Sequence, residues 1–242
     1  MSKRGLSLFV SAVMLTMFAL TGCGGGTKAP EESKAVESSE TAGESKSEEA
    51  KSEGAKDSSK LIVVGYAQVG AESDWRTANT ESFKSTFVPE NGYELIFNDA
   101  QQKQENKIKA IRDFIQQEVD YIVLAPVVET GWDTVLQEAK DAGIPVILSD
   151  RMIKTSDDSL YTALVCGDFI KEGETAGHWL EEYLRSKSAD NDKKINIVTL
   201  QGTIGASAQV GRTDGFANIL AQHPNWNMLA KQTGEFTQSK GQ

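Results

Sequence analysis

Short apolar runs alternate with longer amphipathic segments along the chain from residue 61 onward. Runs this short, rich in Ile, Val, Leu and aromatic residues, are typical of buried strands rather than helices. We therefore expect strands at residues 61–67, 93–97, 121–124, 144–148 and 195–200, and a further strand near 227–231. Strands that alternate with helices predict an α/β fold built on parallel sheets.

The segments between these runs carry apolar residues at helical spacing. Segment 102–117 places Ile108, Ile111, Phe114 and Ile115 on one face, and segment 132–142 does the same with Val135, Leu136 and Ala139 before Gly143 ends it. A third helix over 169–184 would have Ile170, Ala176, Leu180 and Tyr183 as its inner stripe. A fourth is expected over 206–221, and residues 236–240 read as the start of another.

The stretch LIVVGYAQVGAESDWR, residues 61–76, organises the first half of the chain. It reads as a strand, a turn at Gly70 and a helix capped by Ser73 or Asp74. Ligands of open parallel α/β sheets bind outside the carboxyl ends of the strands, so Glu72, Asp74, Trp75 and Arg76 are expected to face a crevice, together with Ser73. The alternative is an ordinary connection between a strand and a helix that carries a surface Trp.

The N-terminus reads as an export signal. Lys3 and Arg4 precede an apolar run over residues 6–20, which Leu-Thr-Gly-Cys follows at residues 20–23. This ending resembles a bacterial lipobox, in which the cysteine is acylated, so we expect residues 1–23 to be a lipoprotein signal peptide and Cys23 the lipidation site. The alternative is a plain secretory signal with an incidental cysteine.

Residues 24–60 contain Gly, Ser, Glu, Lys and Ala without apolar periodicity, so we expect a disordered tether. Beyond it we expect an N-terminal lobe over 61–165 and a partial C-terminal lobe over 166–242. The first lobe has enough strands for a complete sheet, whereas the second has two. This imbalance predicts a C-terminally truncated chain; the alternative is a small accessory half-domain.

Composition excludes several classes of function. The formal net charge of −10 argues against a nucleic-acid partner. With Cys23 acylated, Cys166 would remain alone in an apolar stretch, most often as a small core residue. His178 and His223 lack the spacing of metal ligands, and no Ser lies in a nucleophile elbow. We therefore expect no catalytic residues, no metal and no cofactor.

Further polar candidates follow later strands. Asp150 and Arg151 come directly after the run at 144–148, so they should lie at the same sheet edge as Glu72. A carboxylate beside a guanidinium can bind vicinal hydroxyl groups, as in sugars. Trp75 and Trp132 offer flat faces for a sugar ring. Arg212 lies in the helix that follows the small-residue loop at 201–207 and could approach from the opposite side.

Several long runs resemble ABC-transporter solute-binding proteins of the ribose/galactose type, above all the galactofuranose-binding members. They are AQVGAESDWR, NDAQQKQENKIKAIRDFI, LAPVVETGWDTVLQEAKDAGIPV, SDR, LQGTIGASAQVGR and GEFTQSKG. The resemblance implies a type I periplasmic-binding-protein fold with two Rossmann-like lobes, the second incomplete here. It also implies sugar-binding positions at Glu72, Ser73, Asp74, Trp75, Arg76, Asp150, Arg151 and Arg212. Pentose-binding relatives have Asn at the position of Ala125, so this chain departs from ribose-like recognition.

We therefore expect a monomeric, membrane-anchored binding lipoprotein, not an enzyme, that captures a monosaccharide and delivers it to an ABC transporter permease. Its location would be extracytoplasmic, either lipid-anchored to the outer face of the cell membrane or periplasmic. The alternatives are a sugar-sensing input module for a chemoreceptor or sensor kinase, a sugar-responsive repressor, and a surface hydrolase that uses Asp150 and Glu72. The export signal argues against the repressor.

Overall fold

The computed structural model describes residues 60–187 and 193–242. These ranges include both predicted lobes, apart from residues 188–192 of the second. The predicted signal peptide, its Cys23 and residues 24–59 of the predicted tether lie outside the described residues.

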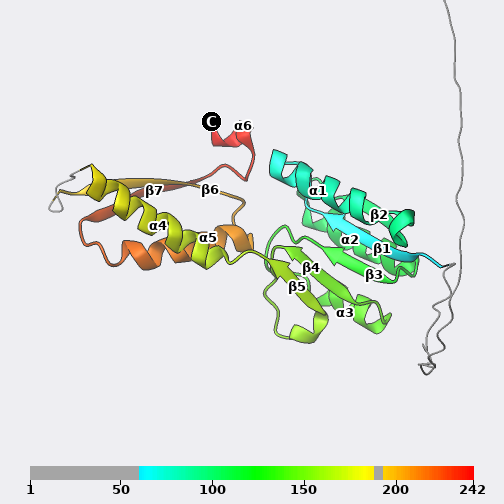
Figure 1. The fold of residues 1–242 in the computed structure, drawn as a ribbon. Coiled ribbons are helices and arrows are strands. Elements are labelled where there is room, and N and C mark those ends of the chain that lie inside the picture. Colours follow the sequence, from blue (N-terminus) through cyan, green and yellow to red (C-terminus); the bar gives the residue numbers. More distant parts are fainter. Residues whose placement is uncertain (1–59, 188–192) are drawn as a thin grey trace, which may run out of the picture. The chain divides into compact units, whose positions relative to one another are not determined.

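The first half folds around a parallel sheet with strand order β2-β1-β3-β4-β5 (Figure 1). The strands are β1 (Ile62–Gln68), β2 (Tyr93–Asp99), β3 (Tyr121–Leu124), β4 (Val146–Asp150) and β5 (Ala163–Cys166). β1 pairs with β2 on one side and β3 on the other, with Tyr66 opposite Phe97 and Val123. The predicted parallel α/β sheet is confirmed.

Helices cover both faces of this sheet. They are α1 (Asp74–Thr86), α2 (Gln104–Gln116) and α3 (Asp133–Asp141), and two short 3-10 helices, η1 (Pro89–Asn91) and η2 (Asp158–Leu160), lie in the connections. Ile111 and Phe114 of α2 and Leu136 of α3 are buried against one face, while Tyr66 on the other face stacks on Phe83 of α1. The apolar stripes predicted for segments 102–117 and 132–142 are thus confirmed.

Two details of the sheet differ from the sequence-based expectation. β4 runs from Val146 to Asp150, so Asp150 ends the strand instead of following it. Cys166, expected in the core, is exposed. It lies on β5, whose only partner in the described sheet is β4, so this strand is an edge with less cover than the centre.

The second half contains α4 (Phe169–Ser186), β6 (Ile195–Gln201), α5 (Ser207–Leu220), β7 (Trp226–Thr233) and the short α6 (Gln238–Gly241). β6 and β7 form a parallel pair. The stripe predicted for α4 from Ile170, Ala176, Leu180 and Tyr183 is wrong at three positions. Ile170 and Tyr183 are 50% and 45% exposed and Ala176 is also exposed, whereas Leu180 is partly buried.

The face of α4 that packs against α5 is built on glycines instead. Gly173 and Gly177 are buried, and so are Gly211 and Gly215 of α5. A Cβ atom on Gly173 would clash with the backbone of Arg212, and one on Gly215 with the carbonyl of Ile170. The helices pack this closely because neither has a side chain at these positions, and glycine carries no hydrophobic signal in the sequence.

Candidate functional site

The loop after β1 carries the first part of the candidate site. Ser73, one of the two predicted caps, caps α1 by accepting a hydrogen bond from Arg76 N at 3.2 Å. Glu72 lies just before the cap, and its Oε1 accepts from Arg76 Nε at 3.0 Å. Both side chains are 2% exposed, so a short loop and one helical turn bury an ion pair.

The carboxyl end of β4 brings a second ion pair to the first. Arg76 Nη2 donates to Asp150 Oδ2 at 2.6 Å. Arg151 Nη2 lies 3.8 Å from Glu72 Oε1, and Arg151 Nε lies 3.7 Å from Asp150 Oδ2. Glu72, Arg76, Asp150 and Arg151 therefore form one buried group of two carboxylates and two guanidiniums, which we call the charge cluster.

The pKa values of the two guanidiniums in the cluster shift in opposite directions. Burial alone would lower the pKa of Arg76, but the charges of Asp150 and Glu72 and their hydrogen bonds raise it. Burial, followed by the neighbouring charge of Arg76, lowers the pKa of Arg151 to about 10. Both guanidiniums remain charged at neutral pH and keep their N–H groups as donors.

Three polar atoms of the cluster have no hydrogen-bond partner within the described residues, although each is buried. They are Glu72 Oε2, Arg76 Nη1 and Arg151 Nε. Buried polar atoms of native proteins nearly always have a partner, from the protein, from water or from a ligand. The cluster thus retains one acceptor and two donors, the set that binds hydroxyl groups.

Asp150 has a left-handed backbone with φ +67°, which is uncommon for a residue other than glycine, asparagine or aspartate. Arg151 leaves this turn pointing back into the lobe, where its Nη1 donates to Val127 O at 3.3 Å. The sharp turn explains how two neighbouring residues both reach the charge cluster.

The two candidate tryptophans differ in exposure: Trp75 is exposed and Trp132 is buried. Trp75 is 57% exposed, and the guanidinium carbon of Arg76 lies 4.8 Å from its ring centroid. Its ring therefore remains accessible beside the cluster, as does the exposed Asp74. Trp132 is fully buried and donates to Val128 O at 2.7 Å, so its proposed role as a face for a sugar ring is wrong and it belongs to the core.

Arg212 is not brought into direct contact with the cluster. Its Nε donates to Glu172 Oε2 at 2.7 Å, and its guanidinium carbon lies 5.1 Å from the Phe169 ring centroid. Both partners of this ion pair are 46% exposed, and the positive charge of Arg212 still contributes to the lowered pKa of Arg151.

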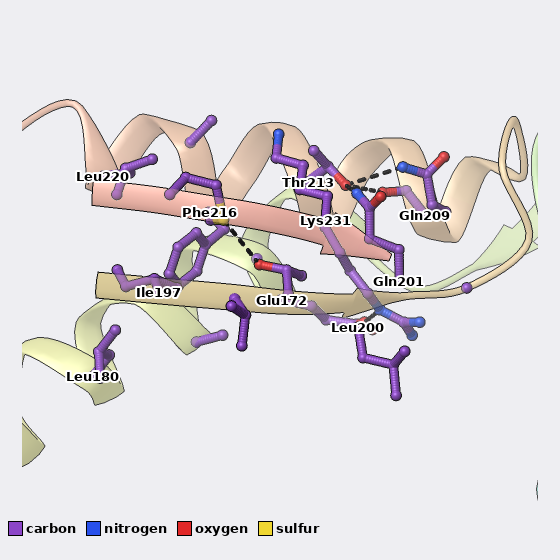
Figure 2. Close-up of a pocket in the computed structure, with 18 of the residues that line it drawn as sticks. Glu172, Leu180, Ile197, Leu200, Gln201, Gln209, Thr213, Phe216, Leu220 and Lys231 are labelled. Atoms are coloured by element: carbon purple, nitrogen blue, oxygen red, sulfur yellow. Dashed lines mark hydrogen bonds and ion pairs between the residues drawn. The ribbon is translucent and has the colours of Figure 1, made fainter. Parts of the chain in front are cut away.

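A large cavity of about 1040 Å³ lies among α4, α5, β6 and β7 (Figure 2). Leu180, Ile197, Phe216 and Leu220 make much of its lining apolar, and at one end Gln201 and Gln209 donate to Thr213. Arg212 lines this cavity, but none of the charge cluster does. We therefore place the candidate site at the cluster and regard the cavity as an uncovered apolar face.

Three further residues support the site but were not singled out from the sequence. Gln68 Nε2 donates to Tyr66 Oη at 2.6 Å and to Asn79 Oδ1 at 2.8 Å, which ties the end of β1 to α1. Lys107 Nζ donates to Ala67 O at 2.7 Å from the other side. The guanidinium carbon of Arg151 lies 5.1 Å from the ring centroid of Phe236. The burial of Lys107 could have been detected in the sequence, because Lys107 lies on the same helical stripe as Ile111 and Phe114.

The described residues, 60–187 and 193–242, offer no candidate metal site and no membrane-spanning helix. No group of three or more His, Cys, Asp or Glu side chains there could hold a metal ion. Across that same part of the chain, every helix is too short or too polar to span a membrane.

The strand order of the first sheet and a polar cluster at the carboxyl ends of β1 and β4 are features of α/β ligand-binding proteins. Residues 64–242 match the periplasmic binding protein domain, and the chain belongs to that family. Its fold is the type I periplasmic-binding-protein fold, as the resemblance implied.

The relatives that the chain resembles are binding proteins, not enzymes. Over 180 residues the chain is 49% identical to the galactofuranose-binding protein YtfQ of Escherichia coli K12, covering 74% of this chain and 54% of that protein. A solved structure from Mycobacterium smegmatis, in complex with β-D-fucofuranose, shares 50% identity with a TM-score of 0.69 and covers 74% of this chain and 58% of that one. The binding component of the arabinose ABC transporter of Shewanella sp. ANA-3, bound to α- and β-L-arabinofuranose, shares 48% identity with a TM-score of 0.67, covering 74% and 56%. The chain spans about half the length of the relatives it matches.

Proposed function

We propose that this chain is the sugar-binding component of an ABC transporter and captures a monosaccharide in its furanose form. The observation that carries the proposal is the charge cluster, in which buried Glu72 Oε2, Arg76 Nη1 and Arg151 Nε have no hydrogen-bond partner among the described residues. Two relatives near 50% identity are described as complexes with furanoses, which supports the same class of ligand here.

Each predicted site residue has a role in this proposal. Asp150 and Glu72 accept hydrogen bonds from sugar hydroxyls, and Arg76 and Arg151 donate them. Trp75 stacks its indole on the C–H face of the ring. Ser73 and Asp74 shape the loop, and Arg212 contributes a donor from the second half of the chain. Captured sugar is then handed to a membrane permease.

We also propose the export route expected from the sequence: residues 1–23 act as a lipoprotein signal, Cys23 is acylated and residues 24–60 tether the binding domain to the outer face of the membrane. Expression in a bacterium with Cys23 intact should place the protein in the membrane fraction. Cys23→Ser should release it or leave it unprocessed. A Cys23→Ser protein processed and anchored like the wild type would exclude lipidation.

Sugar binding is tested by melting the purified protein with D-galactose, D-fucose and L-arabinose, each of which includes furanose forms in solution. Methyl pyranosides of the same sugars, locked in the six-membered ring, serve as controls. A ligand at 100 times its dissociation constant adds about 2.7 kcal/mol to the free energy of unfolding, a readily measured shift. We expect at least one free sugar, and none of the pyranosides, to raise the melting temperature. A melt unchanged by every sugar would contradict the proposal.

A further inference from the structure

Lys107 is fully buried, which is rare for a lysine. It lies in the first half of α2, on the stripe that also buries Ile111 and Phe114. Its Nζ donates to Ala67 O at 2.7 Å, and the same carbonyl accepts from Ala125 N at 3.2 Å. Lys107 therefore joins α2 to the point where β1 and β3 end together.

The charged groups that act on Lys107 are Arg76, Arg151 and Glu72 of the charge cluster and Asp99 of β2. Burial lowers the pKa of its amino group well below the usual value, and the positive charges of Arg76 and Arg151 lower it further, against smaller opposing effects of Glu72 and Asp99. The two guanidiniums and two carboxylates of the charge cluster already balance. A protonated Lys107 would add an uncompensated positive charge to this interior, whereas the neutral amine keeps N–H donors without that cost.

The carbonyl of Ala67, which accepts the hydrogen bond from Lys107, lies just before the loop that carries Glu72. Beyond Ala67, Gln68 ends β1 and its side-chain Oε1 accepts from Val69 N at 2.8 Å. Val69 O then accepts from Gln102 N at 2.7 Å, close to the start of α2. The next residues of this loop include Glu72, so its path depends on how α2 holds the end of β1.

We propose that Lys107 is a positioning residue for the sugar site: it fixes the carboxyl end of β1 and thereby the loop that presents Glu72 and Arg76. This inference rests on the proposed function, because its readout is sugar affinity. Lys107 acts through the charge cluster and is not itself assigned a contact with the sugar.

Calorimetric titration of the wild type, Lys107→Met and Lys109→Met with D-galactose, D-fucose and L-arabinose between pH 6 and 9 tests the proposal. Met keeps the length of the side chain without its donors, and Lys109 is an exposed lysine on the same helix. Sugar binding withdraws the cluster further from water and so disfavours protonated Lys107. Wild-type and Lys109→Met affinities should therefore fall as the pH is lowered. Lys107→Met should bind about tenfold more weakly at pH 8, with an affinity that no longer depends on pH in this way.

The outcomes separate the two proposals. A wild type that binds none of the sugars overturns the proposed function and this inference with it. If the wild type binds and Lys107→Met matches its affinity and pH profile, only the inference fails. Should Lys107→Met not fold, the wild type with ¹³C-labelled lysine side chains gives a second measurement. Sugar should shift the resonance of the lysine that titrates abnormally low and lower its midpoint, and an unchanged resonance would overturn the inference.

Discussion

The guanidinium of Arg76 donates to the carboxylate of Asp150 at 2.6 Å, although 74 positions separate the two residues in the sequence. Arg76 lies in the first turn of α1 and Asp150 at the end of β4, so this bond links two distant segments at one edge of the sheet. The side chains of Arg76 and Asp150 are 2% and 15% exposed, and water therefore screens the interaction weakly.

Replacing Asp150 with Ala should destabilise the protein strongly. The variant would leave Arg76 buried with Glu72 as its remaining ion-pair partner, and breaking a buried pair in this way costs about 3–5 kcal/mol. Urea denaturation measures the difference. Asp141→Ala is the matched control, because Asp141 is exposed and accepts only from Gln137 Nε2 at 2.7 Å among the bonds of the described residues. Equal stability of the two variants would show that the pair contributes little.

Replacing Trp75 with Ala should weaken sugar binding and leave stability nearly unchanged. Trp75 is 57% exposed, so its removal should alter the free energy of unfolding by less than about 0.5 kcal/mol. Loss of a stacking face should reduce affinity about tenfold, which corresponds to about 1.4 kcal/mol. Trp179 of α4 is 62% exposed and provides the control. If Trp75→Ala and Trp179→Ala bind sugar equally well, stacking on Trp75 is excluded.

Replacing Gly215 with Ala should disrupt the contact between α4 and α5. A methyl group there would clash with the carbonyl of Ile170, which is backbone and cannot rotate away. Overpacking of this kind costs about 1–3 kcal/mol. Ala217→Met, which adds a larger group at an exposed position of the same helix, should be nearly neutral. A fall in melting temperature for Ala217→Met as large as that for Gly215→Ala would contradict this explanation.

Stability should also depend on pH through Lys107. Its pKa is lower in the folded protein than in the unfolded chain, so between these two values the unfolded chain binds the extra proton. The free energy of unfolding must then rise with pH, by up to about 1.4 kcal/mol per pH unit, until the unfolded lysine also loses its proton. Urea denaturation from pH 7 to 9 should show that the free energy of unfolding of the wild type increases with pH relative to that of Lys107→Met. Parallel curves for the two proteins would mean that Lys107 is charged in the folded state.

The first half of the fold could be predicted from local patterns because each strand and helix has a signal within a few residues. Ser73 as a helix cap and the apolar faces of α2 and α3 were predictable for that reason. The placement of Asp150 and Arg151 near Glu72 followed from the rule that parallel strands end at one edge.

Features that depend on packing were not predictable in the same way. Trp132 lies in the core and Cys166 on the surface, and the neighbouring residues in the sequence indicate neither position. The α4 stripe was largely wrong because the contact of α4 with α5 is built on glycines, which carry no hydrophobic signal. Arg212 forms an ion pair with Glu172, a partner that the sequence does not indicate, and its place in the sugar site stays a prediction.

Binding of a sugar at the charge cluster is tested most directly by calorimetric titration of Arg151→Ala beside Arg112→Ala. Arg151 is 3% exposed, and its buried Nε lacks a hydrogen-bond partner within the part of the chain that the structure describes, whereas Arg112 pairs with Glu138 on the surface. We expect the sugar that stabilises the wild type to bind Arg112→Ala with unchanged affinity and to bind Arg151→Ala at least about a hundredfold more weakly, a loss of about 2.8 kcal/mol. Wild-type affinity in a folded Arg151→Ala protein would contradict the account and place the sugar elsewhere.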